Sequence, residues 1–218
     1  MRANETHPWE IAWREGRWTE TSPPLPAVVD FTEDLKREGA KKVLDLGCGA
    51  GRHSILLGKA GFQVVALDIS ETALKILEAR LNTASIDNVT LVENEMWDLP
   101  FIDDYFDGMI CTNVLHHGKL VQIKQATREV HRVMRDGASA FVIALSTADF
   151  RRGTGRKLEP NTYVFTEGEE RGIIHHFFPR KDLESCFRKF ETVSFEERLI
   201  PVEGGGNRAH FLVRLRKA

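Results

Sequence analysis

The segment Lys41–Leu57, KKVLDLGCGAGRHSILL, restricts the fold of this chain more than any other stretch. The apolar run that ends at Leu44 is too short for a helix and predicts a buried strand, which closes at Asp45. Helical spacing resumes over Arg52–Ala60, after three glycines at every second position, Gly47, Gly49 and Gly51. Glycines at a strand-to-helix turn let the backbone turn sharply and approach a ligand closely, because they carry no Cβ. The segment therefore predicts an α/β fold with a nucleotide-type ligand at this turn.

Two features of the turn disfavour a dinucleotide. The pattern G-x-G-x-x-G, started at Gly47, needs a third glycine where the chain has Arg52, and no Gly-Lys-Ser/Thr follows at the P-loop spacing. A pyrophosphate favours the positive end of a helix with no anion beside it, whereas Asp45 places a carboxylate just before the glycines. A ligand with an ammonium group suits this position better. An NAD(P)-dependent oxidoreductase is the weaker alternative.

The stretch Asp45–Gly51, DLGCGAG, closely resembles the first motif of class I S-adenosylmethionine-dependent methyltransferases. The resemblance runs from Trp9 to the C-terminus, and its most specific part is Val43–Ala144. Gly51-Arg52 and Asp68-Ile69-Ser70 look like the small-molecule branch (methyltransferase type 11) that includes the tellurite-resistance methyltransferases. The resemblance implies a Rossmann-like fold: a mostly parallel seven-stranded sheet with an antiparallel C-terminal hairpin. It also implies S-adenosylmethionine as methyl donor and S-adenosylhomocysteine as product.

Length and composition favour one domain. A chain of 218 residues that is 42% hydrophobic can bury a single α/β core. We expect residues 1–218 to form one methyltransferase domain, with 1–38 as an N-terminal helical cover. Residues 147–178 break the regular alternation of elements and predict an insertion that acts as a lid.

Charge and cysteine content bear on partners and location. A net charge of −2 and a pI near 6.5 predict no general attraction to nucleic acid or to an anionic membrane. Three cysteines without paired spacing suit a reducing compartment. No apolar run is long enough to span a bilayer, and Met1–Glu10 lacks the apolar centre of a signal peptide. These features predict a cytoplasmic protein and leave its oligomeric state open.

The donor site is expected at the ends of the first strands. Asp68 follows the second predicted strand about 20 residues past the glycines, where an acidic side chain accepts hydrogen bonds from a ribose. Asp68 or Ser70 can instead cap the next helix, and both roles can hold together. The resemblance implies that Glu95 contacts the adenine amino group, although the family usually has the shorter Asp there. The full set of expected donor contacts is Asp45, Gly47, Cys48, Gly49, Gly51, Asp68, Ile69, Glu95, Met96 and Asn113.

The acceptor site is expected beyond the fourth strand, where Asn113 leads into Val114–His117. Ligands of open parallel sheets bind outside the carboxyl ends of the strands. His116 is therefore the candidate general base, because imidazole titrates near neutral pH; the alternative is a histidine that packs or bonds to the backbone. Further acceptor contacts are predicted for Trp13, His117, Tyr163 and His175. The histidine pairs His116-His117 and His175-His176 suggest a metal site. They lack the spacing of known metal ligands, so no metal is predicted.

The tryptophans near the N-terminus allow two interpretations. Trp9 and Trp13 are four residues apart and share one face of a predicted helix. The favoured interpretation is that they pack on the domain, because large aromatic side chains are mostly buried. The other is that they close over the active site, as the N-terminal segment of the resembled family often does.

The expected reaction is in-line transfer of a methyl group from a sulfonium to the lone pair of a small-molecule acceptor. Alignment of the two reactants and exclusion of water can supply most of the rate enhancement. The sequence leaves the accepting atom open among O, N, S and a metalloid. It also leaves open a non-catalytic module that binds S-adenosylmethionine and has no acceptor pocket.

Overall fold

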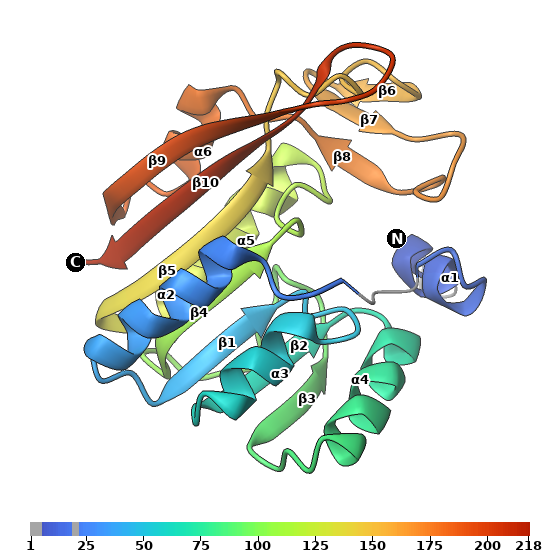
Figure 1. Ribbon diagram of the computed structural model, residues 1–218. Helices are drawn as coiled ribbons and strands as arrows, with labels where there is room; N and C mark the ends of the chain where they lie inside the picture. Colours follow the sequence, from blue (N-terminus) through green and yellow to red (C-terminus); the bar gives the residue numbers. More distant parts are fainter. Residues whose placement is uncertain (1–5, 19–21) are drawn as a thin grey trace.

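A seven-stranded sheet forms the centre of the computed structural model, which describes residues 6–18 and 22–218 (Figure 1). The strand order is β3-β2-β1-β4-β5-β10-β9, and β10 runs antiparallel to both of its neighbours. This architecture confirms the predicted fold class, including the antiparallel hairpin at the C-terminus. The strands are β1 (Lys42–Leu46), β2 (Gln63–Asp68), β3 (Val89–Glu93), β4 (Phe106–Thr112), β5 (Met134–Leu145), β9 (Phe190–Pro201) and β10 (Asn207–Lys217).

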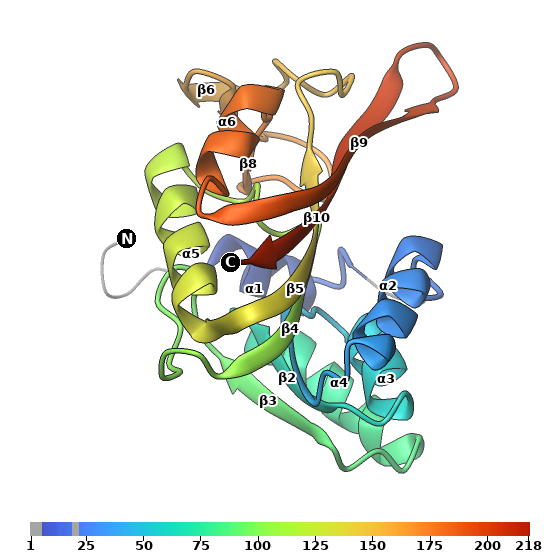
Figure 2. The same cartoon turned by 90° about the vertical axis from the view of Figure 1, so that its left-hand side faces the viewer.

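Helices cover both faces of this sheet (Figure 2). One face carries α2 (Pro26–Arg37), α3 (Arg52–Lys59) and α4 (Glu71–Thr83), and the other carries α5 (Leu120–Val133) and α6 (Arg180–Cys186). Successive side chains of a strand point to opposite faces. Val43 accordingly packs with Leu57 of α3, and Leu44 packs with Ile123 of α5. Burial on both faces explains why the inner strands read as continuous apolar runs.

The fifth helix ends earlier than its sequence pattern indicates. The apolar spacing predicts a helix over Leu120–Arg135 that stops at Asp136-Gly137, with the next strand at Ala138. In the structure the helix ends at Val133, and Met134 is already extended, with φ −82° and ψ 144°. Met134 is fully buried and pairs with Phe106 of β4. Pairing across the sheet therefore prevails over the local helical pattern.

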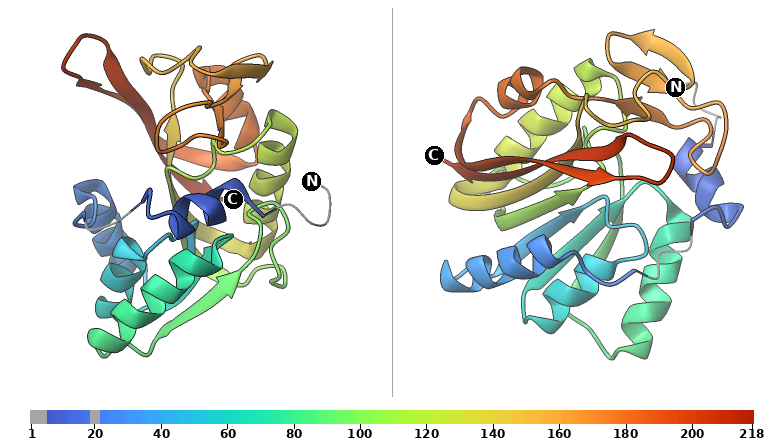
Figure 3. Two further views of the ribbon diagram at one scale, coloured as in Figure 1. Left: turned by 90° about the vertical axis from the view of Figure 1, so that its right-hand side faces the viewer. Right: turned by 45° about the horizontal axis from the view of Figure 1, so that its top comes forward.

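Residues 147–178 are built on a second, antiparallel sheet rather than on irregular chain. Its strands are β6 (Arg156–Glu159), β7 (Thr162–Val164) and β8 (Ile174–His176). Figure 3 shows this small sheet beyond the carboxyl ends of the central strands, at the same end as the tip of the β9–β10 hairpin. Its role as a lid stays a prediction.

The N-terminal helix α1 (Pro8–Arg14) lies across the same end of the sheet (Figure 1). It is held on one side by Glu10, whose carboxylate accepts hydrogen bonds from Ser70 and Thr72 at the start of α4. Of the predicted cover over 1–38, residues 1–5 and 19–21 lie outside the described residues. In the part of the chain that the structure describes, no helix has the length and apolar character needed to cross a membrane.

Leu77 tests the packing of α4, because its side chain is fully buried against Ala66 and Leu81. We expect Leu77→Ala to lower the free energy of unfolding by about 2–5 kcal/mol, since it removes buried methyl groups and leaves a cavity. The neighbouring Ile76 is 39% exposed, so Ile76→Ala should cost less. Denaturant unfolding of both variants is the measurement. Equal losses would contradict the packing described here.

Candidate active site

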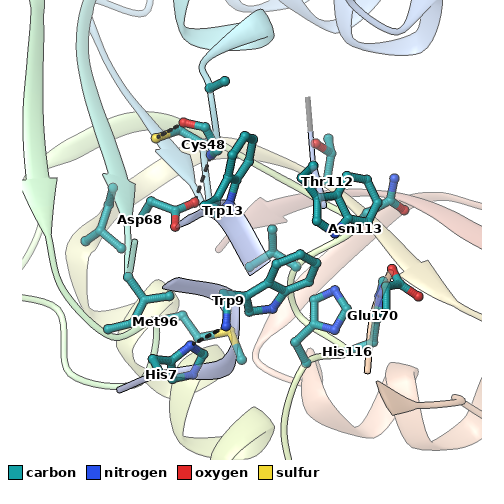
Figure 4. Close-up of a pocket in the computed structure, with 18 of the residues that line it drawn as sticks. His7, Trp9, Trp13, Cys48, Asp68, Met96, Thr112, Asn113, His116 and Glu170 are labelled. Atoms are coloured by element: carbon teal, nitrogen blue, oxygen red, sulfur yellow. Dashed lines mark hydrogen bonds between the residues drawn. The ribbon is translucent and has the colours of Figure 1, made fainter. Parts of the chain in front are cut away.

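A cavity of about 270 Å³ opens at the carboxyl ends of β1, β2 and β4. The glycine turn after β1 and Asp68 line one end of it, and Glu95 and Met96 lie beside them. His116 and Glu170 line the other end, as Figure 4 shows. The cavity therefore joins the predicted donor residues to the region predicted for the acceptor.

The glycine turn needs glycine for two different reasons. Gly47 and Gly51 have φ of +74° and +80°, a conformation that residues with a Cβ rarely adopt. A Cβ on Gly47 would lie 2.2 Å from Val114, and one on Gly51 would lie 2.1 Å from Leu77. Gly47 and Gly49 line the cavity, whereas Gly51 does not: it lets α3 and α4 pack closely.

Asp68 connects the glycine turn to the start of α4. Its Oδ2 accepts a hydrogen bond from the N–H of Gly49 at 2.8 Å, and its Oδ1 accepts one from the N–H of Ser70 at 2.9 Å. Ser70 itself is the N-cap, since its hydroxyl accepts the N–H of Ala73 at 3.1 Å. Burial raises the pKa of Asp68. A carboxylate has about four acceptor sites, so Asp68 can hold these two donors and still bind a ligand.

Asp45 lies beneath the turn and does not line the cavity. It is 2% exposed, and Oδ2 accepts a hydrogen bond from the hydroxyl of Ser54 at 2.6 Å. Burial, with a smaller contribution from the negative charge of Asp68, raises the pKa of Asp45 to about 7 although the hydrogen bond from Ser54 lowers it. Any effect of Asp45 on a ligand must therefore pass through the turn.

The tryptophans of the N-terminal segment both pack on the domain and line the cavity. Trp13 is 9% exposed and packs on Ala50 and Ala73, close to Gly49. Trp9 lies edge-on to His117, with ring centroids 4.8 Å apart. The two interpretations of this segment are thus compatible.

Two adjacent histidines form the far end of the cavity. Nδ1 of His116 lies 3.3 Å from the N–H of Leu145, and Nδ1 of His117 lies 3.2 Å from the carbonyl oxygen of Ile174. Burial lowers the pKa of His116 well below its ordinary value and lowers the pKa of His117 to about 3. Both rings are therefore neutral near pH 7.

Charged residues from the insertion lie beside these histidines. Arg151 and Glu170 line the cavity, and Arg151 is 3.3 Å from Glu170 and 2.9 Å from the buried Asp149. Burial alone would raise the pKa of Glu170. Contact with His175 at 3.1 Å and the nearby positive charges outweigh this effect and lower the pKa to about 2. Glu170 is therefore a carboxylate at neutral pH.

Two residues predicted for the acceptor site do not line the cavity. His175 is fully buried behind it, stacked on Phe165 with ring centroids 4.0 Å apart. Tyr163 packs against Phe177 in a separate apolar cluster. Among the described residues, no group of three or more His, Cys, Asp or Glu side chains is placed to hold a metal ion.

Several lining residues carry no local signal in the sequence. In the sequence Arg151 belongs to a basic run, which can attract an acidic acceptor but is more often a solvated face. Arg208 and His210 lie on the antiparallel strand β10, more than ninety residues past the end of β4. Tertiary packing alone brings them to the cavity. The lining residues without a predicted role are His7, Trp18, Ala50, Arg52, His53, Leu67, Asn94, Trp97, Thr112, Val114, Arg151, Glu170, Arg208 and His210.

Comparisons with known proteins match the part of the chain that carries the predicted donor residues. Residues 43–137 match the family model described as a methyltransferase domain. A demethylmenaquinone methyltransferase of Clavibacter sepedonicus is 35% identical over 119 residues, which are 55% of this chain and 47% of that protein. The chain spans about half the length of the curated relatives it matches.

Solved structures share the whole fold at low identity. A SAM-dependent methyltransferase of Methanosarcina mazei matches with a TM-score of 0.73 and 19% identity, over 90% of this chain and 99% of that one. The 1,6-didemethyltoxoflavin-N1-methyltransferase of Burkholderia thailandensis, solved with S-adenosylhomocysteine bound, matches with a TM-score of 0.70 and 20% identity, over 96% and 85%.

The sheet order and the glycine turn define a Rossmann-like α/β fold, which the solved methyltransferases share. Residues 43–137, which contain the glycine turn and Asp68, are thus similar to methyltransferase domains, in agreement with the resemblance of the sequence to the class I S-adenosylmethionine-dependent methyltransferases.

The raised pKa of Asp45 predicts a pH-dependent stability. Below the ordinary pKa of 3.8 the folded and unfolded states are both protonated, and the stabilising contribution is fully present. It is lost as the pH rises through about 7, because the folded state holds its proton longer than the unfolded state does. We expect the stability of the wild type to fall over this range relative to Asp45→Asn, which keeps an acceptor for Ser54. Denaturant unfolding at several pH values measures the difference.

The matched control is Asp87→Asn, at an exposed residue outside the cavity. Its stability difference from the wild type should not change with pH over the same range. Parallel pH profiles for Asp45→Asn and the wild type would contradict the assignment.

Proposed function

We propose that this protein transfers the methyl group of S-adenosylmethionine to a small-molecule acceptor, with S-adenosylhomocysteine as product. The observation that carries the proposal is that one continuous cavity runs from the glycine turn to the two histidines. One end fits the family's donor motif, and the other offers polar groups to a second molecule. A non-catalytic module would need only the first end.

The donor end fits S-adenosylmethionine in charge and shape. Asp68 accepts from the ribose hydroxyls and Glu95 from the adenine amino group, while Ile69 and Met96 pack on the adenine. The open faces of Gly47 and Gly49, which line the cavity without a Cβ, let the methionine part approach the backbone closely. The side-chain amide oxygen Oδ1 of Asn113 is buried and, within the described residues, has no hydrogen-bond partner. Such an orphan acceptor fits the ammonium group of the donor.

The chain's own contribution to the reaction is positioning and exclusion of water. When bound, the sulfonium of the donor supplies an electrophilic methyl group. Trp9 and Trp13 cover the cavity from α1, which Glu10 ties to α4. The covered cavity holds donor and acceptor in line and removes water that would compete for the acceptor's polar groups. The relative and the solved structure reported above are named for small molecules, which supports an acceptor of that kind.

The cofactor is tested by calorimetry with four ligands. We expect S-adenosylmethionine and S-adenosylhomocysteine to bind, and NAD and NADP not to bind, because Arg52 replaces the third glycine and Asp45 lies before the turn. Tighter binding of a nicotinamide cofactor than of S-adenosylhomocysteine would overturn the proposal in favour of an oxidoreductase.

Asp68 is the sharpest test of the donor site. Asp68→Ala should weaken binding of S-adenosylhomocysteine by roughly 1.5–3 kcal/mol, about tenfold or more, because it removes charge-assisted hydrogen bonds to the ribose. Glu95→Gln should cost less, since its amide oxygen still accepts. The control is Asp87→Ala, at an exposed position outside the cavity. Unchanged affinity in a folded Asp68→Ala protein would leave Asp68 with its structural role only.

A further inference from the structure

His116 and His117 present opposite hydrogen-bonding atoms to the cavity. A backbone N–H can only donate, so Nδ1 of His116, which faces the N–H of Leu145, is the accepting nitrogen. The proton of this neutral ring therefore lies on Nε2. A carbonyl oxygen can only accept, so Nδ1 of His117, which faces Ile174, carries the proton. Nε2 of His117 therefore keeps its lone pair.

Both rings are held in these states by their surroundings. Their centroids are 4.3 Å apart, and His117 is enclosed by Trp9 at 4.8 Å and His175 at 4.7 Å. The backbone around them is also fixed, since the carbonyl of His116 accepts the N–H of His176 at 2.8 Å. Burial disfavours protonation of either ring. Neither histidine can exchange its role without losing its backbone partner.

The two Nε2 atoms are the ones available to a ligand. Both residues line the cavity, and the bonds to Leu145 and Ile174 each engage Nδ1. The backbone of Asn113, like that of Ile174, favours a donating N–H on the His117 ring. The charged neighbours are largely paired: Glu170 contacts Arg151 and His175, and Arg151 also contacts Asp149. Arg208 is exposed, and His210 is partly buried beside it. The two histidines therefore add one neutral donor and one neutral acceptor to these charges.

We propose that His116 and His117 recognise the methyl acceptor as a pair, with one donating and the other accepting a hydrogen bond. The matching ligand is a neutral group in which an O–H or N–H lies beside an oxygen, such as a carboxamide or a hydroxy-carbonyl compound. A carboxylate has no hydrogen for Nε2 of His117, and an ammonium has no lone pair for the Nε2–H of His116. Each leaves one buried partner unsatisfied. The assignment rests on the proposed function, since it names the acceptor class of the same site.

The tautomers are tested directly by long-range ¹H–¹⁵N correlation spectra of the ¹⁵N-labelled protein near pH 7. His116→Gln and His117→Gln assign the two sets of signals, and His131→Gln is the control, since His131 packs on Phe190 outside the cavity. We expect a proton on Nε2 of His116 and on Nδ1 of His117. The same tautomer in both rings, or a doubly protonated ring, would overturn the proposal.

Selectivity is tested with three probes of one size: benzamide, benzoate and benzylamine. They carry, in turn, a donor beside an acceptor, acceptors only, and donors only. Calorimetry on the protein loaded with S-adenosylhomocysteine should show benzamide binding roughly tenfold or more tightly than either of the others. Preference for benzoate or benzylamine, or no difference among the three, would overturn the proposal.

Variants of His116 and His117 test the separate hydrogen-bonding roles of the two side chains. His117→Phe should narrow the preference for benzamide over benzoate, because it removes the accepting atom. His116→Phe should narrow the preference over benzylamine, because it removes the donating one. His131→Phe should leave both preferences unchanged, and an equal effect of all three variants would contradict the pairing.

Failure of the proposed function is distinguishable from failure of this inference. A protein that does not bind S-adenosylhomocysteine contradicts the proposed function, and the tautomers and probe preferences are then measured without it. A protein that binds it but lacks opposite tautomers contradicts the recognition pair alone.

Discussion

The carboxylate of Asp68 joins the two turns that form the floor of the cavity. One oxygen holds the N–H of Gly49 after β1, and the other holds the N–H of Ser70 before α4. Because β1 and β2 are parallel neighbours, their carboxyl ends lie side by side, and one buried side chain can connect both turns. Much of the proposed donor half of the site depends on this connection.

The hydrogen bonds of Asp68 also reach helix α1, which covers the cavity, through Ser70. Ser70 donates to Glu10 at 2.6 Å, which fixes α1 above the turn. At the other end of this segment, Arg17 donates to the carbonyl oxygens of Glu169 and Arg171, on either side of the cavity residue Glu170. The N-terminal segment thus contacts the proposed donor end and the proposed acceptor end at once. Its tryptophans can exclude water from both.

Sequence reasoning predicted the donor half more completely than the acceptor half, for a physical reason. The predicted donor residues follow parallel strands. Parallel strands bring their carboxyl ends to one edge of the sheet, and this does not depend on how the other segments pack. Asp68, Glu95 and Asn113 therefore line the cavity as expected. Tyr163 and His175 belong to the small second sheet, where alternation of side chains turns them toward an apolar cluster and away from the cavity. Their direction depends on a register that local sequence does not encode.

The sequence by itself determined the parallel sheet, the glycine turn and the class of ligand that the turn binds, because strand periodicity, glycine and a carboxylate at the turn act locally. Only the tertiary structure decided that Asp45 lies beneath the turn, that Met134 begins a strand, and that Arg151, Glu170 and His210 meet the two histidines. It also decided the proton positions on His116 and His117, since each depends on a backbone group, Leu145 or Ile174, from a distant element. Contacts between residues far apart in the chain follow from packing, and packing is set by the whole fold.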